Sequence, residues 1–191
     1  VASLRSSEIR DLMSLANKPN MILFSGGMPD NDLFPLQEVD AIYMRLTARE
    51  KQIAMQYGPT PGIPQLLDSL SGFLREKGLP VDDNKLLITT GSLQAINILG
   101  HAFIDPGDTI LVENPCFIGA ISAFRSYQAN IVSIPLTPGG IDLKALQHTL
   151  DSLEVKPKFL YLTPNFHNPA GTLYHRETKL QLIEILRNHD I

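Results

Sequence analysis

The chain has 191 residues, a hydrophobic content of 43% and a formal net charge of −4, so it is long enough to bury a core of its own. No apolar run approaches the roughly 20 residues that span a bilayer, and no basic block marks a nucleic-acid binder, so we expect a small-molecule partner, no membrane and no nucleic acid. The single cysteine, Cys116, excludes an internal disulfide and offers no metal cluster; with no export signal visible, it predicts a cytoplasmic protein without a metal site.

The amino-terminal part of the chain predicts short elements separated by turns. An amphipathic helix near the start is expected to be capped by Ser6 or Ser7, and a later one to begin after Pro35, where a missing N–H costs nothing. The expected elements are a helix over residues 3–16, a strand over 21–24, a loop over 28–35, a helix over 36–47 and a loop over 57–62.

From Gly62 onward the pattern becomes regular. Apolar residues recur every three or four positions up to Gly78, which predicts an amphipathic helix. Strands are then expected near 86–90, 109–113, 130–134 and 158–162, and helices near 92–103, 117–127, 142–153 and 175–189. This alternation predicts an α/β fold with parallel strands, right-handed crossovers and helices on both faces of the sheet. The last helix runs to the end of the chain with no strand after it, so we expect the chain to stop in the middle of a domain.

Polar or glycine-containing segments follow the predicted strands, at the edge where parallel sheets gather ligands. Gly91-Ser92 opens a helix, and the free amides and positive dipole there suit a phosphate group. Neither the spaced glycines of the dinucleotide fold nor a P-loop follows, so the phosphate need not belong to a nucleotide. Taken alone, an ordinary serine N-cap is the simpler interpretation.

Two further residues occupy comparable positions. Phe117 follows the strand 109–113, where its ring can stack on a flat ligand or serve as a core aromatic. Asn168 follows the strand 158–162, where its amide can donate to a phenolate oxygen or simply form an Asn-Pro turn. Neither residue decides between these alternatives by itself.

Five motifs taken in order resemble the fold type I pyridoxal-phosphate aminotransferases, and most closely the branch containing 2-aminoadipate and kynurenine aminotransferases. They are Ser25-Gly26-Gly27-Met28-Pro29, Tyr57-Gly58-Pro59-Thr60-Pro61-Gly62, Ile88-Thr89-Thr90-Gly91-Ser92-Leu93-Gln94, Glu113-Asn114-Pro115-Cys116-Phe117 and Asn168-Pro169-Ala170-Gly171. The resemblance covers essentially the whole chain. It implies the parallel-rich three-layer sheet of the large domain, truncated, with residues 1–50 as helical arm and small-domain or linker segment and 51–191 as the first part of the large domain.

The resemblance also implies which residues bind the cofactor, pyridoxal 5′-phosphate. Gly91, Ser92 and Leu93 match positions that meet its phosphate, with the backbone serving at Leu93, where the family often has a polar side chain. Phe117 matches the aromatic residue, commonly tyrosine, that stacks on the pyridine ring. Asn168 matches the asparagine that binds the phenolic oxygen of that ring.

Three more residues match positions that involve a second subunit or the substrate. Tyr57 matches a tyrosine that reaches the phosphate of the neighbouring subunit, which implies a homodimer with shared active sites. Gly27 matches a backbone contact to the substrate carboxylate. Arg10 matches an arm position that meets an acidic substrate side chain in some relatives.

The remaining groups of such a site are expected beyond Ile191. The family needs a lysine that forms a Schiff base, an aspartate that pairs with the pyridinium nitrogen and an arginine that grips the α-carboxylate. Lys158 lies at the start of a predicted strand and Lys179 in an amphipathic helix, so neither is a substitute. The 191 residues alone are therefore predicted to be inactive and to lack the central strands of their sheet.

Two classes of function remain open for the full-length protein. The first is an aminotransferase of amino acid metabolism, which passes the amino group of an amino acid to a 2-oxo acid. The alternative is the aminotransferase-like effector-binding domain of a bacterial transcription regulator, which carries a winged-helix domain upstream and often an aromatic residue at the position of Asn168. The enzyme-like Asn168-Pro169-Ala170-Gly171 favours the aminotransferase. A generic phosphate-binding α/β domain is a third hypothesis, which the combined motifs disfavour. The substrate and the type of reaction on the amino acid stay open.

Overall fold

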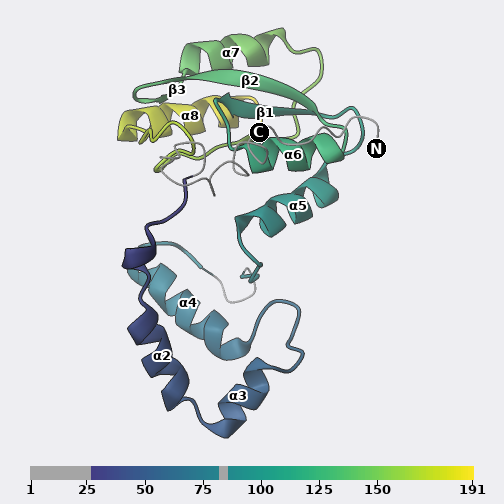
Figure 1. The fold of residues 1–191 in the computed structure, drawn as a ribbon. Coiled ribbons are helices and arrows are strands. Elements are labelled where there is room, and N and C mark those ends of the chain that lie inside the picture. The colour runs from purple at the N-terminus through teal and green to yellow at the C-terminus, as the bar shows by residue number, and fades with distance from the viewer. Residues whose placement is uncertain (1–26, 82–85) are drawn as a thin grey trace, which may run out of the picture. The chain divides into compact units, whose positions relative to one another are not determined.

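The computed structural model describes residues 27–81 and 86–191 (Figure 1). The chain divides into two compact units, Val1–Ile88 and Thr89–Ile191, and each is described by itself. The predicted helix 3–16, the predicted strand 21–24 and Arg10 lie outside the described residues. Within the described ranges, no helix is long and apolar enough to cross a membrane, and no three His, Cys, Asp or Glu side chains gather as metal ligands would. The division of the chain after residue 50 stays a prediction.

The described part of the first unit is helical. Its elements are η2 (Asn31–Leu33), α2 (Leu36–Arg45), α3 (Ala48–Ala54) and α4 (Pro64–Glu76). The predicted helix 36–47 and the predicted amphipathic helix between Gly62 and Gly78 are confirmed as α2 and α4. Helix α3 was not predicted, although Thr47 and Glu50 form a capping box in which each side chain bonds the other residue's backbone N–H.

The second unit contains a four-stranded sheet in the order β3-β2-β1-β4. The strands are β1 (Thr109–Asn114), β2 (Asn130–Thr137), β3 (Gly140–Ile141) and β4 (Leu160–Tyr161). Strand β1 pairs in parallel with β2 along its full length and with β4 over two residues, so the predicted parallel sheet is confirmed. The short antiparallel strand β3 returns along β2 and was not predicted.

The predicted strand over 86–90 is wrong. Residues 86–89 take no regular structure, and the N–H of Ile88 donates to the carbonyl of Pro61 at 2.8 Å. A strand exists only where a neighbour accepts its backbone hydrogen bonds, and none of the four described strands pairs with this segment. The apolar run therefore has the composition of a strand, but it has no neighbouring strand among the described residues to pair with.

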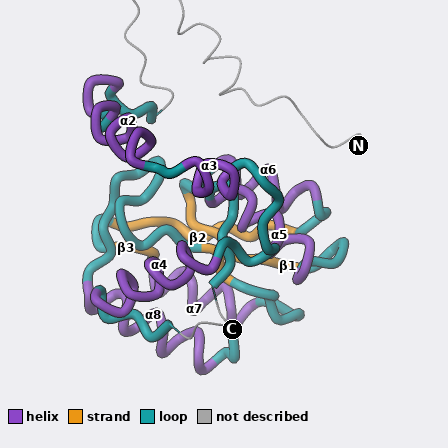
Figure 2. Tube along the Cα trace, turned by 90° about the horizontal axis from the view of Figure 1, so that it is seen from below, coloured by secondary structure: helices purple, strands orange, loops and turns teal. Residues whose placement is uncertain are grey.

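Helices cover both faces of the sheet, as predicted (Figure 2). They are α5 (Ser92–Phe103) and α6 (Ile118–Ser126) on one face, and α7 (Leu143–Ser152) and α8 (Arg176–Asn188) on the other. Alternate residues of β1 enter opposite cores: Ile110 and Val112 pack with Phe124 of α6, whereas Leu111 packs with Leu146 of α7 and Leu182 of α8. Burial of both faces explains why the centre of β1, Ile110–Val112, consists of consecutive apolar residues.

Candidate active site

The candidate site lies at the carboxyl edge of the sheet. Strands β1 and β4 are parallel, so their ends at Asn114 and Tyr161 face the same edge. The segment leading to Phe117 follows the first strand, and a loop over residues 163–174 that carries Asn168 follows the second. Open α/β sheets bind ligands at this edge.

The amino end of α5 is open to an anion. Gly91 has φ +75° and ψ 170°, a conformation that is essentially restricted to glycine, and no atom lies within 4 Å of where its Cβ would be. No side chain caps the helix: Oε1 of Gln94 accepts instead from the N–H of Thr90, at 2.5 Å. The N–H groups of Ser92 and Leu93 have no acceptor within the helix, and both residues are exposed.

The first turns of α5 and α6 meet at Gly119. A Cβ on Gly119 would lie 2.5 Å from Cζ of Phe117 and 3.3 Å from Cδ1 of Leu93, so the Phe117 ring lies directly over this glycine. The ring is half-buried and packs against the core that contains Phe124. Phe117 is thus partly a core aromatic, as one prediction had it, and partly an accessible ring at the strand end.

A buried carboxylate joins the two strand ends. The side chain of Glu113, in β1, is fully buried and accepts three hydrogen bonds from the loop 163–174. The backbone N–H of Thr163 donates to Oε2 at 2.8 Å, Nε2 of His167 to Oε2 at 3.1 Å, and the hydroxyl of Tyr174 to Oε1 at 2.5 Å. Three donors offset the cost of removing the charge from water.

The hydrogen bonds indicate the tautomer of His167. The N–H of Ala170 donates to Nδ1 of His167 at 3.2 Å, so this nitrogen carries no proton. The remaining nitrogen, Nε2, must carry it and is the donor to Glu113. Burial and the adjacent Glu113 carboxylate raise the pKa of the Tyr174 hydroxyl far above its ordinary value, so Tyr174 stays a donor over the whole working pH range.

The loop that carries Asn168 is folded back on itself. The N–H of His167 donates to the carbonyl of Thr172 at 3.0 Å, and the N–H of Gly171 to the carbonyl of His167 at 2.6 Å. Asn168 is exposed and precedes a cis proline peptide bond. Phe166 has φ +50° and is 84% exposed, an unusual state for a bulky residue.

Cys116 lies between Glu113 and Phe117 and is half-buried. Burial raises the pKa of its thiol to about 11, and the negative charge of Glu113 contributes. The thiol is therefore protonated and unreactive at neutral pH, which makes it a packing residue.

Not all of the predicted residues gather in one unit. The second unit holds Gly91, Ser92, Leu93, Phe117 and Asn168, and it brings Leu93 and Phe117 together at Gly119. Tyr57 and Gly27 belong to the first unit; Tyr57 is 99% exposed, and no atom lies within 4 Å of a Cβ placed on Gly27. Arg10 lies outside the described residues.

Sequence reasoning missed the roles of Glu113, His167, Tyr174 and Gly119. Glu113 was quoted as part of a motif but given no function. A charged residue that ends an otherwise apolar strand was the available signal, because such a residue needs buried partners. Its partners were not identifiable from spacing, since they lie 50, 54 and 61 residues further along the chain.

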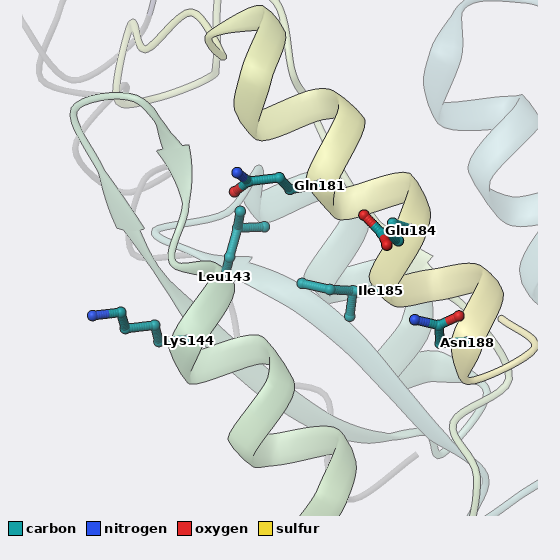
Figure 3. A pocket seen from close by; sticks show the side chains of 6 residues that line it. All are labelled: Leu143, Lys144, Gln181, Glu184, Ile185 and Asn188. Atoms are coloured by element: carbon teal, nitrogen blue, oxygen red, sulfur yellow. The ribbon is translucent and has the colours of Figure 1, made fainter.

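Two cavities of the second unit lie away from these residues. One, of about 490 Å³, is a shallow depression between α7 and α8; in Figure 3, Lys144 points away from the other lining side chains. The other, of about 550 Å³, runs along the free edge of β4 between Leu99, Phe103 and residues 158–162. Neither is lined by Ser92, Phe117 or Asn168.

Comparison with known proteins assigns the chain to a family. The model of the family described as aminotransferase class I and II matches residues 19–191. The 2-aminoadipate transaminase of Thermus thermophilus is 36% identical over 183 residues, which cover 96% of this chain and 44% of that protein. The chain spans about half the length of the curated relatives it matches.

Structural similarity and a second group of relatives complete the comparison. A crystal structure of Pyrococcus horikoshii kynurenine aminotransferase, in complex with PMP, is 31% identical with a TM-score of 0.92, covering 99% of this chain and 48% of that chain. The uncharacterized HTH-type transcriptional regulator YdcR of Escherichia coli is 29% identical over 96% of this chain and 39% of its own length. On the family match and the shared fold together, the chain belongs to the class I and II aminotransferases.

Proposed function

We propose that the full-length protein is a pyridoxal 5′-phosphate-dependent aminotransferase that transfers the amino group of an amino acid to a 2-oxo acid. Membership of the family and the similarity to a kynurenine aminotransferase with PMP bound support this proposal. It concerns the full-length protein, because this chain spans about half the length of its relatives.

One observation carries the proposal: the amino end of α5 fits a phosphate group. Gly91 takes a conformation that leaves open space at its Cβ position, and the exposed first turn of α5 holds no acidic residue and no side-chain cap. The free N–H groups of Ser92 and Leu93 and the helix dipole favour an anion at this point. A side chain at Gly91 would strain the backbone. It would also occupy the space through which a phosphate group reaches the first turn of α5.

The other residues of the second unit suit the ring of the same cofactor. The accessible side of Phe117 would hold the pyridine ring by stacking, without the hydroxyl contact that a tyrosine gives. The exposed amide of Asn168 would donate a hydrogen bond to the phenolic oxygen. When bound, the cofactor supplies an electron sink for breaking a bond at the amino-acid carbon.

The proposed site needs further groups. We propose that Tyr57 reaches the phosphate of the neighbouring subunit in a homodimer, that Gly27 holds the substrate carboxylate through its backbone, and that Arg10 meets an acidic substrate side chain. The lysine and aspartate of the family lie in the second half of the protein in this proposal, so the present 191 residues alone are inactive. The proposed location is the cytoplasm.

A transcription regulator is the second candidate, because YdcR also matches the chain. Both classes would bind the cofactor. The difference is turnover: an effector-binding domain holds the cofactor without transferring amino groups. The asparagine at position 168 favours the enzyme.

The test uses the full-length protein and its Gly91→Val variant. We expect the protein to bind pyridoxal phosphate in an absorbance titration, to transfer amino groups from an amino acid to a 2-oxo acid, and to lose cofactor affinity when Gly91 is replaced. The variant Gly72→Ala is the control, because no atom lies within 4 Å of its Cβ position on α4. Unchanged affinity in Gly91→Val would refute the phosphate site, and binding without turnover would favour the regulator.

Exchange between two inactive homodimers tests the shared site. One parent carries Tyr57→Ala and the other lacks the cofactor-binding lysine of the second half. A mixed dimer regains both groups in one of its two sites, so activity should reappear after subunit exchange. Parents that fold and exchange normally but stay inactive when mixed would exclude the cross-subunit role of Tyr57.

A further inference from the structure

Glu113 links the two segments on which the proposed ring contacts lie. It stands four residues before Phe117, and its carboxylate holds the loop 163–174 at both ends, through Thr163 at one end and Tyr174 at the other. His167, the residue next to Asn168, provides the third bond. One buried side chain therefore sets how the loop of Asn168 stands against the strand end that leads to Phe117.

Tyr174 is itself held in place. The Tyr174 ring is 3% exposed and packs over Gly140, where a Cβ would lie 2.7 Å from Cγ of the ring. The N–H of Tyr174 donates to the carbonyl of Pro164 at 3.0 Å. The hydroxyl of Tyr174 is therefore a fixed donor, and the carboxylate of Glu113 cannot move without losing it.

The loop conformation needs such support. Phe166 has a left-handed backbone, which a bulky side chain disfavours, and its side chain makes little contact because it is 84% exposed. Packing of Phe166 does not account for its backbone. A strained conformation persists only when its surroundings impose it, and here the bonds of Thr163, His167 and Tyr174 flank the strained residue.

We propose that Glu113, His167 and Tyr174 form a positioning cluster that sets the amide of Asn168 for its bond to the phenolic oxygen of the cofactor. The inference rests on the proposed function, since it assigns a purpose to the loop only if Asn168 binds that oxygen. None of the three residues touches the cofactor in this proposal: Glu113 and His167 are buried, and all three act through the backbone of the loop.

The chain offers a closely matched control for Tyr174. Tyr127 also packs over a glycine, with a Cβ on Gly100 lying 2.8 Å from its ring, and its hydroxyl also donates to an oxygen of another element, the Asn97 carbonyl, at 3.1 Å. Tyr127 has no bond to the loop 163–174. Tyr174→Phe and Tyr127→Phe each delete one hydroxyl, but only the first touches the cluster.

The experiment follows the bound cofactor in the full-length protein. Pyridoxal phosphate is added to the wild type, Asn168→Ala, Tyr174→Phe, Tyr127→Phe and the double variant Asn168→Ala/Tyr174→Phe. Two quantities are measured: the dissociation constant, and the pH midpoint at which the absorption of the bound cofactor changes. A donor to the phenolic oxygen stabilises its ionised form, so loss of that donor raises the midpoint.

We expect Asn168→Ala to raise the dissociation constant about tenfold and the midpoint by about one pH unit. Tyr174→Phe should shift both in the same direction by about threefold and half a unit, and should add nothing in the Asn168→Ala background. Tyr127→Phe should change neither. Hydrogen exchange of the loop amides in the cofactor-free protein should speed up in Tyr174→Phe but not in Tyr127→Phe.

Each other outcome has a defined meaning. If Asn168→Ala shifts neither quantity, the proposed contact of Asn168 is wrong and the inference falls with it. If Asn168→Ala shifts both but Tyr174→Phe behaves like Tyr127→Phe, or acts equally without Asn168, the inference alone is overturned. If Tyr174→Phe does not fold, Glu113→Gln, which keeps the volume and removes the charge, is judged by the same criteria.

Discussion

Replacement of Gly119 by alanine tests where the Phe117 ring lies, without any ligand. The added Cβ would lie 2.5 and 2.6 Å from Cζ and Cε1 of Phe117, whereas carbon atoms in contact prefer about 3.5–4.0 Å. The ring must therefore retreat by about 1 Å. Leu93, at 3.3 Å, needs to give by only a few tenths of an ångström.

The magnitude follows from two opposing effects. Overpacking of this kind costs about 1–3 kcal/mol, while alanine gains about 0.5–1 kcal/mol over glycine in a helix such as α6. The difference between the two effects is a net loss of up to about 2.5 kcal/mol in the free energy of unfolding. When Phe117 is already alanine, the clash disappears, and the same substitution should stabilise the protein by about 0.5–1 kcal/mol.

The assay is urea unfolding of the full-length protein for Gly119→Ala, Phe117→Ala and the double variant. Gly72→Ala in α4 is the control, since it meets no atom within 4 Å and should stabilise the protein with or without Phe117. The sign of the Gly119→Ala effect is expected to reverse between the two backgrounds. An effect of equal sign and size in both would mean that the ring does not lie over Gly119.

Three further predictions concern the same unit. Gly91→Ala should lower the free energy of unfolding by about 1–3 kcal/mol in urea unfolding, because alanine disfavours φ +75° with ψ 170° even where space is open; an unchanged midpoint would contradict this. The pKa of Cys116 is raised from 9.0 to about 11, so alkylation by iodoacetamide at pH 8 should be about 100-fold slower than for an unperturbed thiol and should rise tenfold per pH unit toward pH 11. Since the folded state holds this proton more tightly than the unfolded state, the contribution of Cys116 to stability should fall as pH rises through that range. Asp142→Ala should cost about 1 kcal/mol in thermal or urea unfolding, because Asp142 accepts from the N–H groups of both Lys144 and Ala145 at 3.0 Å, and Asp142→Asn should restore most of it.

The sequence was sufficient to predict the elements whose own residues carry a recognisable pattern of apolar side chains. Helices α4 to α8 carry apolar stripes, and β1 is buried on both faces, so periodicity and continuous apolarity predicted them. The prediction of a strand over 86–90 was wrong because a strand needs a neighbouring strand to pair with, and a local pattern does not show whether one exists. Strand β3 was missed for a different reason: its two residues are too few to show a periodic pattern.

The same distinction applies to the site. The open turn at Gly91 was predictable, since glycine before a helix and a free first turn are local features. The tie between Glu113 and Tyr174 was not, because it depends on which segments the sheet brings side by side. Phe117 lies between these cases: its position was predicted, but its contact with Gly119 depends on how the ring folds back over α6.

Glu113 and its hydrogen-bond donors lie far apart in the sequence, which has a consequence for how a preparation of the protein is assessed. Closing a loop of 61 residues costs about 2–3 kcal/mol more chain entropy than closing the three residues between His167 and Ala170. The donors lie in the loop that follows β4, so the carboxylate in β1 has them only where that loop stands against the end of β1. A chain with complete helices and a paired sheet, but with the loop unanchored, would lack only these contacts of Glu113. Such chains would give a native far-ultraviolet circular dichroism spectrum, so secondary structure alone would overestimate the fraction of a preparation that is competent to bind.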